Sequence, residues 1–285
     1  MRVAAFITLA FGLSWGLWYG VSPLIDRSLW VALMAAYMFG PLGAALVTAA
    51  IFDRGSVGAA LATRFRLNGW WLVAWLAAPA LIFAAVAVAQ HLPGASAQPF
   101  LAGLETSIRE SGRALPPEMT AKVPPLPVLV LIAMGAGILP NAIAAFGEEA
   151  GWRGYLWSQA RGWGFWRASL FVGLAWGLWH APLIAAGHNY GAAYDGHPWA
   201  GIAMMTAFCI ALSPLMGLLR DRAGSVFPAA ICHGTINAVA TIGALLVAGG
   251  ASPLLTAMSG AAGVAAAAGA ALIVAFLRPN RAPLG

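Results

Sequence analysis

Long apolar runs, separated by short polar intervals, recur along the whole chain. A helix that crosses a bilayer needs about 20 mostly apolar residues. Runs of this kind lie near residues 3–24, 29–52, 70–92, 127–147, 167–186, 199–219, 226–250 and 252–277. They are continuous and lack the alternation that is typical of barrel strands. The pattern therefore predicts an all-α transmembrane bundle of about eight spans, with no soluble domain.

The longest polar interval, residues 93–126, divides the chain unevenly. It is rich in proline, holds three of the seven acidic residues outside the motifs described below, and has room for a short amphipathic helix. We therefore expect three parts. Residues 1–126 form N-terminal transmembrane helices and a polar connector, residues 127–250 form a helical core, and residues 251–285 form a C-terminal helix and tail.

Composition supports a multi-pass protein of the lipid bilayer. The chain is 61% hydrophobic and 8% charged, whereas a typical soluble domain is about 25% charged. The net charge of +6 comes from basic residues scattered between the apolar runs, so we interpret it as a sign of topology and expect no nucleic-acid partner. Cys209 and Cys232 lack CxxC spacing, which argues against a disulfide framework or a structural zinc site.

The positions of lysine and arginine predict the orientation, because cytoplasmic loops carry an excess of these residues. Cytoplasmic N- and C-termini would put ten basic residues inside: Arg2, Arg54, Arg64, Arg66, Arg161, Arg167, Arg220, Arg222, Arg278 and Arg281. Four would lie outside: Arg27, Arg109, Arg113 and Lys122. We therefore predict that both termini are cytoplasmic.

The stretch GEEAGWRGYL, residues 147–156, carries two glutamates and an arginine beside apolar chain. Ionisable residues in a membrane segment are costly and usually functional. Glu149 and Arg153 have the favoured i, i+4 acid-first spacing and can neutralise each other, which indicates a structural or supporting pair. Neighbouring helical residues point about 100° apart, so Glu148 faces elsewhere, without a sequence-local counter-charge. It is a candidate general base.

Two further motifs place polar side chains inside later runs. In HGTIN, His233 and Asn237 share one helix face, and their N–H groups could bind a developing oxyanion. In WGLWH, Trp176 and His180 have the same spacing, and His180 could orient water with Glu148 or help bind a metal. Taken singly, each histidine could be a packing residue and Asn237 could join helices. Together with Glu148 they meet the requirements for hydrolysing an amide.

These groups must converge for that chemistry. On the predicted topology, Glu148 lies at the inner end of its span, His233 lies in the same half of the membrane, and His180 lies nearer the middle. Kinks at Pro140 and Pro182 would help to bring them together. We expect a water-accessible cavity that faces the cytoplasm.

Two other routes to proteolysis find no support in the sequence. The chain has no HExxH zinc-protease motif. Its four aspartates, Asp26, Asp53, Asp195 and Asp221, lie in predicted loops or span ends. A protease of this sequence would therefore use glutamate and histidine.

The three motifs, in this order, resemble those of the CPBP family of CaaX proteases and bacteriocin-processing enzymes, also called the Abi family. EEAGWR resembles its EExxxR motif, WGLWH its aromatic-xxxH motif with Trp176 where Phe is common, and HGTIN its HxxxN motif. The resemblance covers roughly residues 127–245 and implies that residues 127–250 are a catalytic core. It implies an intramembrane endopeptidase acting on membrane-associated or prenylated, CaaX-like substrates. Glu148 and His180 would activate water, His233 and Asn237 would stabilise the oxyanion, and Glu149 and Arg153 would support them.

Members of this family are often labelled metalloproteases. Glu148, His180 and His233 could hold a zinc ion with one open position. The same groups can activate water without a metal, and His233 paired with Asn237 suits an oxyanion hole better than a ligand set, so we expect no cofactor. Two alternatives stay open: a non-catalytic membrane scaffold or immunity protein of the same fold, and a proton-coupled transporter. The transporter is disfavoured because its repeats would spread polar groups over both halves, whereas here they lie in the second half.

Overall fold

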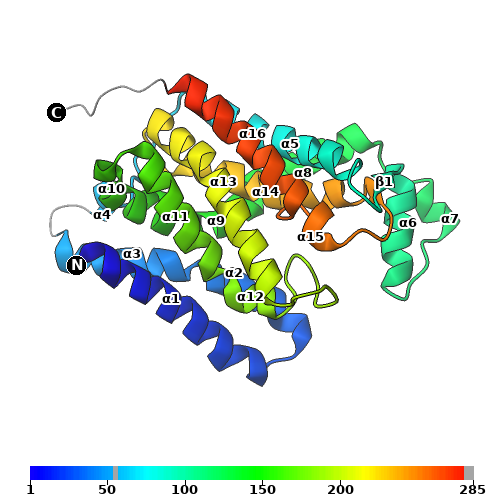
Figure 1. Cartoon of the computed structure of the whole chain (residues 1–285), viewed down its shortest axis with the longest axis horizontal. Helices are drawn as coiled ribbons and strands as arrows, with labels where there is room; N and C mark the ends of the chain where they lie inside the picture. Colours follow the sequence, from blue (N-terminus) through cyan, green and yellow to red (C-terminus); the bar gives the residue numbers. More distant parts are fainter. Residues whose placement is uncertain (54–56, 279–285) are drawn as a thin grey trace.

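The structure is a computed structural model that describes residues 1–53 and 57–278. It confirms the predicted all-α transmembrane bundle (Figure 1). Two basic residues of the charge comparison, Arg54 and Arg281, and the tail from residue 279 lie outside the described residues. The single pair of strands that the described residues form is short: β1 (Ser96–Ala97) lies antiparallel to β2 (Val247–Ala248).

The N-terminal helices form one side of the bundle. Helix α1 (Arg2–Val21) leads through two short 3₁₀ turns, η1 (Ser22–Leu24) and η2 (Arg27–Leu29), into α2 (Trp30–Met38) and α3 (Gly40–Phe52). Helices α1 and α3 lie side by side, as Figure 1 shows in blue. After the short α4 (Val57–Ala60), helix α5 (Trp70–Ala89) crosses to the polar connector. That connector contains two short helices, α6 (Phe100–Glu110) and α7 (Pro117–Thr120).

One long helical run carries the paired glutamates. It consists of α8 (Leu126–Ala136), the π-helical η3 (Gly137–Asn141), α9 (Ala142–Glu149), the π-helical η4 (Ala150–Leu156), α10 (Trp157–Ala160) and η5 (Arg161–Trp163). We predicted that this span would end near residue 147, with Glu148 at its inner end. That prediction was wrong, because the polar GEEAGWRG stretch continues as buried helix and Glu148 lies well inside the run.

The remaining helices complete the bundle. Helix α11 (Phe165–Trp179) ends just before His180, and the short α12 (Ala181–Ala185) follows it. Helices α13 (Trp199–Ala223), α14 (Phe227–Ala244), α15 (Pro253–Thr256) and α16 (Ala261–Leu277) follow in turn. Helix α14, which carries HGTIN, packs against α5 and α9. Helix α11 packs closely along α13.

Fewer segments than predicted are long and apolar enough to be candidate spans. Within the described residues, six helical segments are long and apolar enough to cross a membrane: Arg2–Leu24, Arg27–Phe52, Trp70–Ala89, Leu126–Trp163, Trp199–Ala223 and Pro253–Leu277. Two segments that we predicted as spans are not among them. Helix α11 is short because the chain breaks at His180, and α14 has the histidine, threonine and asparagine of its motif in place of apolar residues.

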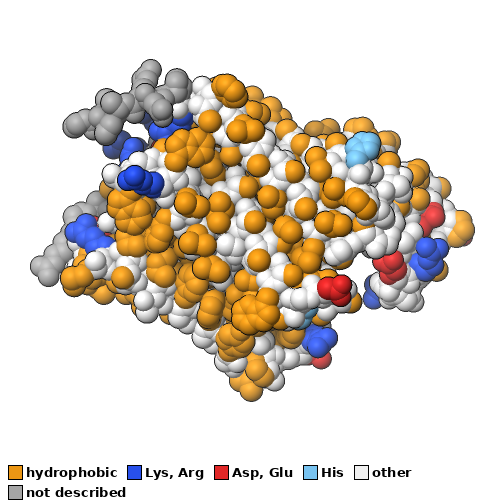
Figure 2. All heavy atoms as spheres, viewed as in Figure 1, with side chains coloured by type: hydrophobic (Ala, Val, Ile, Leu, Met, Phe, Trp, Pro, Cys, Tyr) orange, Lys and Arg blue, Asp and Glu red, His pale blue; other side chains and the backbone are white. Residues whose placement is uncertain are grey.

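The surface agrees with a place in the bilayer. Orange apolar side chains are spread over the whole face seen in Figure 2, and Leu131, Leu272 and Phe276 are among the large exposed hydrophobic residues. A soluble monomer rarely exposes a continuous apolar surface of this size. The exposed lysines and arginines lie at the two ends of the bundle (Figure 2). The chain is therefore an integral membrane protein.

The two ends of the bundle differ in charge. At what we call the basic end, Arg2 pairs with Asp53 at 2.9 Å, Arg222 donates to the Leu277 carbonyl, and Arg220 pairs with Asp221. The start of α1 and the end of α16 both lie there (Figure 1). At the opposite end, which we call the loop end, lie the connector 93–126 and the loop 186–198 (Figure 1).

Candidate functional site

A cavity of about 480 Å³ lies among α2, α9, α11, α13 and α14. Glu148, His180, His233 and Asn237, the four residues predicted to be catalytic, all line it. Apolar side chains from α2 and α13 form much of its remaining wall. The structure therefore brings the polar groups of all three motifs to one space.

Glu148 is buried and has one polar partner among the described residues. The indole Nε1–H of Trp176 donates a hydrogen bond to Glu148 Oε2 over 2.6 Å. The glutamate is 3% exposed, and the bond from Trp176 orients one of its two oxygens. The other oxygen, Oε1, is left for a molecule in the cavity.

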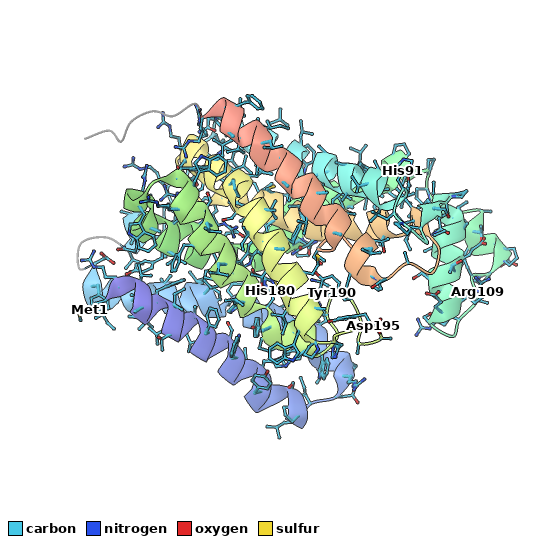
Figure 3. All side chains as sticks on the ribbon, in the orientation of Figure 1. Met1, His91, Arg109, His180, Tyr190 and Asp195 are labelled. Atoms are coloured by element: carbon cyan, nitrogen blue, oxygen red, sulfur yellow. The ribbon has the colours of Figure 1, made fainter. Side chains whose placement is uncertain are left out.

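The tautomer of His180 follows from its hydrogen bond. Its Nδ1 lies 2.8 Å from the carbonyl oxygen of Trp176, one helical turn earlier. A carbonyl can only accept, so Nδ1 carries the proton that is donated. A neutral ring then has its lone pair on Nε2, where it can accept a proton from water. His180 lies at the junction of α11 and α12 and is near the middle of the molecule in Figure 3.

Glu149 belongs to a separate hydrogen-bond network that supports the cavity residues. Its Oε1 accepts from Arg153 Nη1 at 3.2 Å and from His233 Nδ1 at 2.9 Å. Glu149 and Arg153 are both fully buried. The ion pair predicted from their spacing is present, whereas the contact with His233 was not predicted.

Trp176 joins the two networks. Its ring lies 4.1 Å from the guanidinium carbon of Arg153 and 5.4 Å from the ring of His233. Its Nε1–H holds Glu148 and its carbonyl holds His180. From the sequence we recognised Trp176 only as the aromatic residue of its motif. Its polar contacts depend on tertiary placement, which the motif does not encode.

Asn237 lies one helical turn after His233 on α14, as the i, i+4 spacing predicts. Its side chain is exposed, in contrast to that of His233, and lines the cavity. The two side chains thus approach the cavity from one helix face. Their N–H groups are suited to bind an oxyanion, provided that His233 carries a proton on Nε2.

Glycines allow the glutamate-bearing run to approach the N-terminal helices closely. A Cβ on Gly147 would lie 2.8 Å from the Met38 carbonyl oxygen, and one on Gly151 would lie 2.5 Å from the Pro41 Cβ. Both distances are too short for a real side chain. The close approach brings α9 and η4 against the junction of α2 and α3. The π-helical segments on both sides of α9 are of a kind often found at functional sites.

The donor set does not fit a three-ligand metal site. Among the described residues, no three histidine, cysteine, aspartate or glutamate side chains are grouped so that they could hold a metal ion. Nδ1 of His180, Nδ1 of His233 and one oxygen of Glu148 have protein partners, so only Nε2 of each ring and the other carboxylate oxygen are left as donors. We therefore derive no step through a metal, and metal independence stays a prediction.

Several cavity residues were not predicted from the sequence. Four methionines line the cavity from three parts of the chain: Met34 and Met38 on α2, Met205 on α13, and Met258 between α15 and α16. Methionine is flexible and adapts to irregular shapes. His188 and Asn189 also line it. Their side chains are exposed, so the cavity reaches the surface at loop 186–198.

That opening lies at the loop end, away from the basic end. In Figure 3, Tyr190 and Asp195 lie beyond His180 toward Arg109, whereas Met1 lies on the opposite side. We predicted that the termini are cytoplasmic and also that the cavity faces the cytoplasm. These two predictions place the cytoplasm at opposite ends of the bundle, so they cannot both be correct. The conflict arises because we had placed Glu148 at the inner end of its helix. The structure shows that the cavity extends from Glu148 toward the other end.

Comparisons with known proteins concern the same region. The family model described as type II CAAX prenyl endopeptidase Rce1-like matches residues 122–239, which include all three motifs. The protein named CAAX prenyl protease 2 from Methanococcus maripaludis is 41% identical to this chain over 49 residues. That segment is 17% of this chain and 18% of the archaeal protein.

Proposed function

We propose, given that residues 122–239 belong to the Rce1-like family of type II CAAX prenyl endopeptidases, that this chain is an intramembrane endopeptidase. The observation that supports the proposal best is the shared cavity of Glu148, His180, His233 and Asn237. A buried carboxylate, an imidazole with a free Nε2 and two oxyanion donors are the groups needed to hydrolyse a peptide bond with water.

The reaction begins with a water molecule between Glu148 and His180. Glu148 Oε1 takes a proton from this water, and His180 Nε2 accepts a hydrogen bond that orients it. The water oxygen attacks the scissile carbonyl carbon to form a tetrahedral oxyanion. Glu148 then returns the proton to the amide nitrogen as the carbon–nitrogen bond breaks. The products are a new carboxyl terminus and a new amine.

His233 and Asn237 stabilise the oxyanion. Because His233 Nδ1 donates to Glu149, Nε2 can donate to the oxyanion only when the ring carries both protons. The Glu149 carboxylate is the counter-ion for that imidazolium, and Arg153 keeps the carboxylate oriented. Asn237 supplies the second donor from its side-chain amide. Glu149 and Arg153 are thus positioning residues.

The substrate in this proposal is a peptide segment held at the membrane, including a prenylated, CaaX-like tail. The apolar wall of the cavity, with its four methionines, suits apolar groups of varied shape. The name of the relative from Methanococcus maripaludis, CAAX prenyl protease 2, points to the same substrate class.

A comparison of new C-termini in cells tests the proposed function. Membranes from cells that carry the wild-type chain or Glu148→Gln are digested, and C-terminal peptides are quantified by mass spectrometry. We expect a set of C-termini that requires the wild-type carboxylate and is also lost in His233→Ala. Identical C-termini in all samples, with both variants inserted in the membrane, would favour the non-catalytic scaffold.

Metal removal tests the expected absence of a cofactor. Purified protein is dialysed against a strong chelator, and turnover of a farnesylated CaaX peptide is measured before and after. We expect unchanged turnover, because the proposed mechanism uses protein groups alone. Activity that is lost on dialysis and restored by zinc would show that a metal takes part.

A further inference from the structure

Two side chains from the N-terminal helices converge on one carbonyl beside the candidate site. Trp15 Nε1–H on α1 and the Tyr37 hydroxyl on α2 both donate to the carbonyl oxygen of Trp179, at 3.0 Å and 2.5 Å. The residues are 164 and 142 positions apart from Trp179 in the sequence. Neither donor lies in the matched range 122–239.

The two hydrogen bonds are important because the Trp179 carbonyl lies directly before His180 in the chain. Trp179 is the last residue of α11, and its carbonyl carbon forms the peptide bond to His180. Carbonyl groups at the end of a helix lose their intrahelical partners and need others. Pro182, which has no N–H, prevents α11 from continuing as a regular helix. The direction of the Trp179–His180 peptide therefore depends on groups outside α11.

The aromatic rings reinforce this contact. Tyr37 is fully buried, and its ring lies 4.4 Å from that of Trp179. The Trp179 ring in turn lies 4.9 Å from the His180 ring. Ser14 on α1 donates to the Tyr37 carbonyl at 3.1 Å, which ties α1 to α2 at the same level. The chain of contacts runs from the N-terminal helices to His180.

We propose that Tyr37 and Trp15 are positioning residues for His180. By holding the Trp179 carbonyl, they fix the peptide that carries His180, so that Nε2 meets the water beside Glu148. This inference rests on the proposed function for its consequence in catalysis. The N-terminal helices, which carry no recognised motif, thereby form part of the active unit.

The chain offers a matched control for the loss of a buried tyrosine hydroxyl. Tyr155 is also fully buried, and its hydroxyl donates to Asp53 at 3.0 Å, which also joins the N-terminal helices to the second half. Tyr155 does not line the cavity. Tyr155→Phe therefore removes a comparable bond without touching the Trp179 carbonyl.

The first test needs no substrate. Purified protein in detergent is treated with diethyl pyrocarbonate, and the modification rates of His180 and His91 are followed by peptide mass spectrometry. The reagent attacks the lone pair of a neutral imidazole, and His91 is exposed just after α5 and does not line the cavity, so His91 is an internal reference. We expect Tyr37→Phe to raise the rate at His180 by about threefold or more, through local opening, with His91 unchanged. Tyr155→Phe should change neither rate.

The second test uses a quenched fluorescent peptide that ends in a farnesylated cysteine and three further residues. We expect Tyr37→Phe to lower kcat by about tenfold, because small displacements of a reacting group are costly, while KM stays within about twofold. Trp15→Phe, at a less buried position, should act in the same direction and provides the test if Tyr37→Phe does not fold. Tyr155→Phe should keep the wild-type kcat.

The outcomes separate this inference from the proposed function. Unchanged His180 reactivity in both Tyr37→Phe and Trp15→Phe overturns the positioning role, whatever the protein hydrolyses. A raised His180 reactivity supports it, even if the wild-type chain leaves this peptide intact, in which case the proposed function alone is in doubt. An equal loss of kcat in Tyr155→Phe would show that the loss in Tyr37→Phe reflects general destabilisation. That result would also overturn the inference.

Discussion

Glu148 and Glu149 are neighbours with different surroundings. Glu148 faces the cavity and is held by Trp176, whereas Glu149 faces Arg153 and His233. This difference was predictable from residue spacing. Adjacent residues of a helix point in different directions, and an acid and a base at i, i+4 can neutralise each other. The bond from His233 to Glu149 spans 84 residues, so only the packing of α14 against α9 reveals it.

At this scale, we predict that Glu149→Gln destabilises the protein. The substitution preserves the size of the side chain but leaves the buried Arg153 guanidinium without its counter-ion. Breaking a buried ion pair on one side costs about 3 kcal/mol or more. Thermal unfolding in detergent should show a clear fall in the midpoint, together with a loss of turnover. A midpoint equal to that of the wild-type protein would mean that Arg153 has another partner.

At the scale of the secondary-structure elements, helix packing determines where the motifs lie. Gly173 and Gly177 of α11 lie i, i+4 apart and face α13: a Cβ on Gly173 would lie 2.6 Å from the Ile210 Cα, and one on Gly177 would meet the Thr206 backbone. Small residues at this spacing let helices in lipid approach closely. The sequence indicated the helices and their breaks near Pro140 and Pro182. It did not indicate how far the glutamate-bearing run continues, because buried polar residues resemble the end of a span.

We predict that Gly177→Ala separates α11 from α13. The added methyl group has no room, and overpacking of this kind costs about 1–3 kcal/mol. The shift also moves Trp176, so turnover should fall along with the unfolding midpoint. Gly135→Ala is the control, because a Cβ there meets nothing within 4 Å. Equal behaviour of the two variants would show that α11 tolerates the displacement.

At the scale of the whole molecule, the bundle separates a basic end from the end where the cavity opens. Composition was enough to predict a helical membrane protein, because so few charges are available to cover a soluble surface. The opening of the cavity was not predictable, because it depends on the lateral packing of α2, α13 and α14. The excess of arginine at the basic end still predicts that this end is cytoplasmic.

Cysteine labelling tests this orientation. Arg64 is exposed in the segment between α3 and α5, and His188 is exposed at the cavity opening. The native cysteines, Cys209 and Cys232, are buried. In spheroplasts, we expect a membrane-impermeant maleimide to label His188→Cys directly and Arg64→Cys only after permeabilisation. The reverse pattern would place the cavity opening in the cytoplasm, and labelling of both from one side would contradict the bundle.

The central claim is that the carboxylate at position 148 takes a proton from water in the shared cavity. The most direct measurement is kcat for the farnesylated CaaX peptide with purified wild-type protein and Glu148→Gln, which keeps the size and loses the base. We predict that kcat falls by about a hundredfold or more, with the unfolding midpoint preserved. A Glu148→Gln protein that hydrolyses the peptide at the wild-type rate would contradict the account.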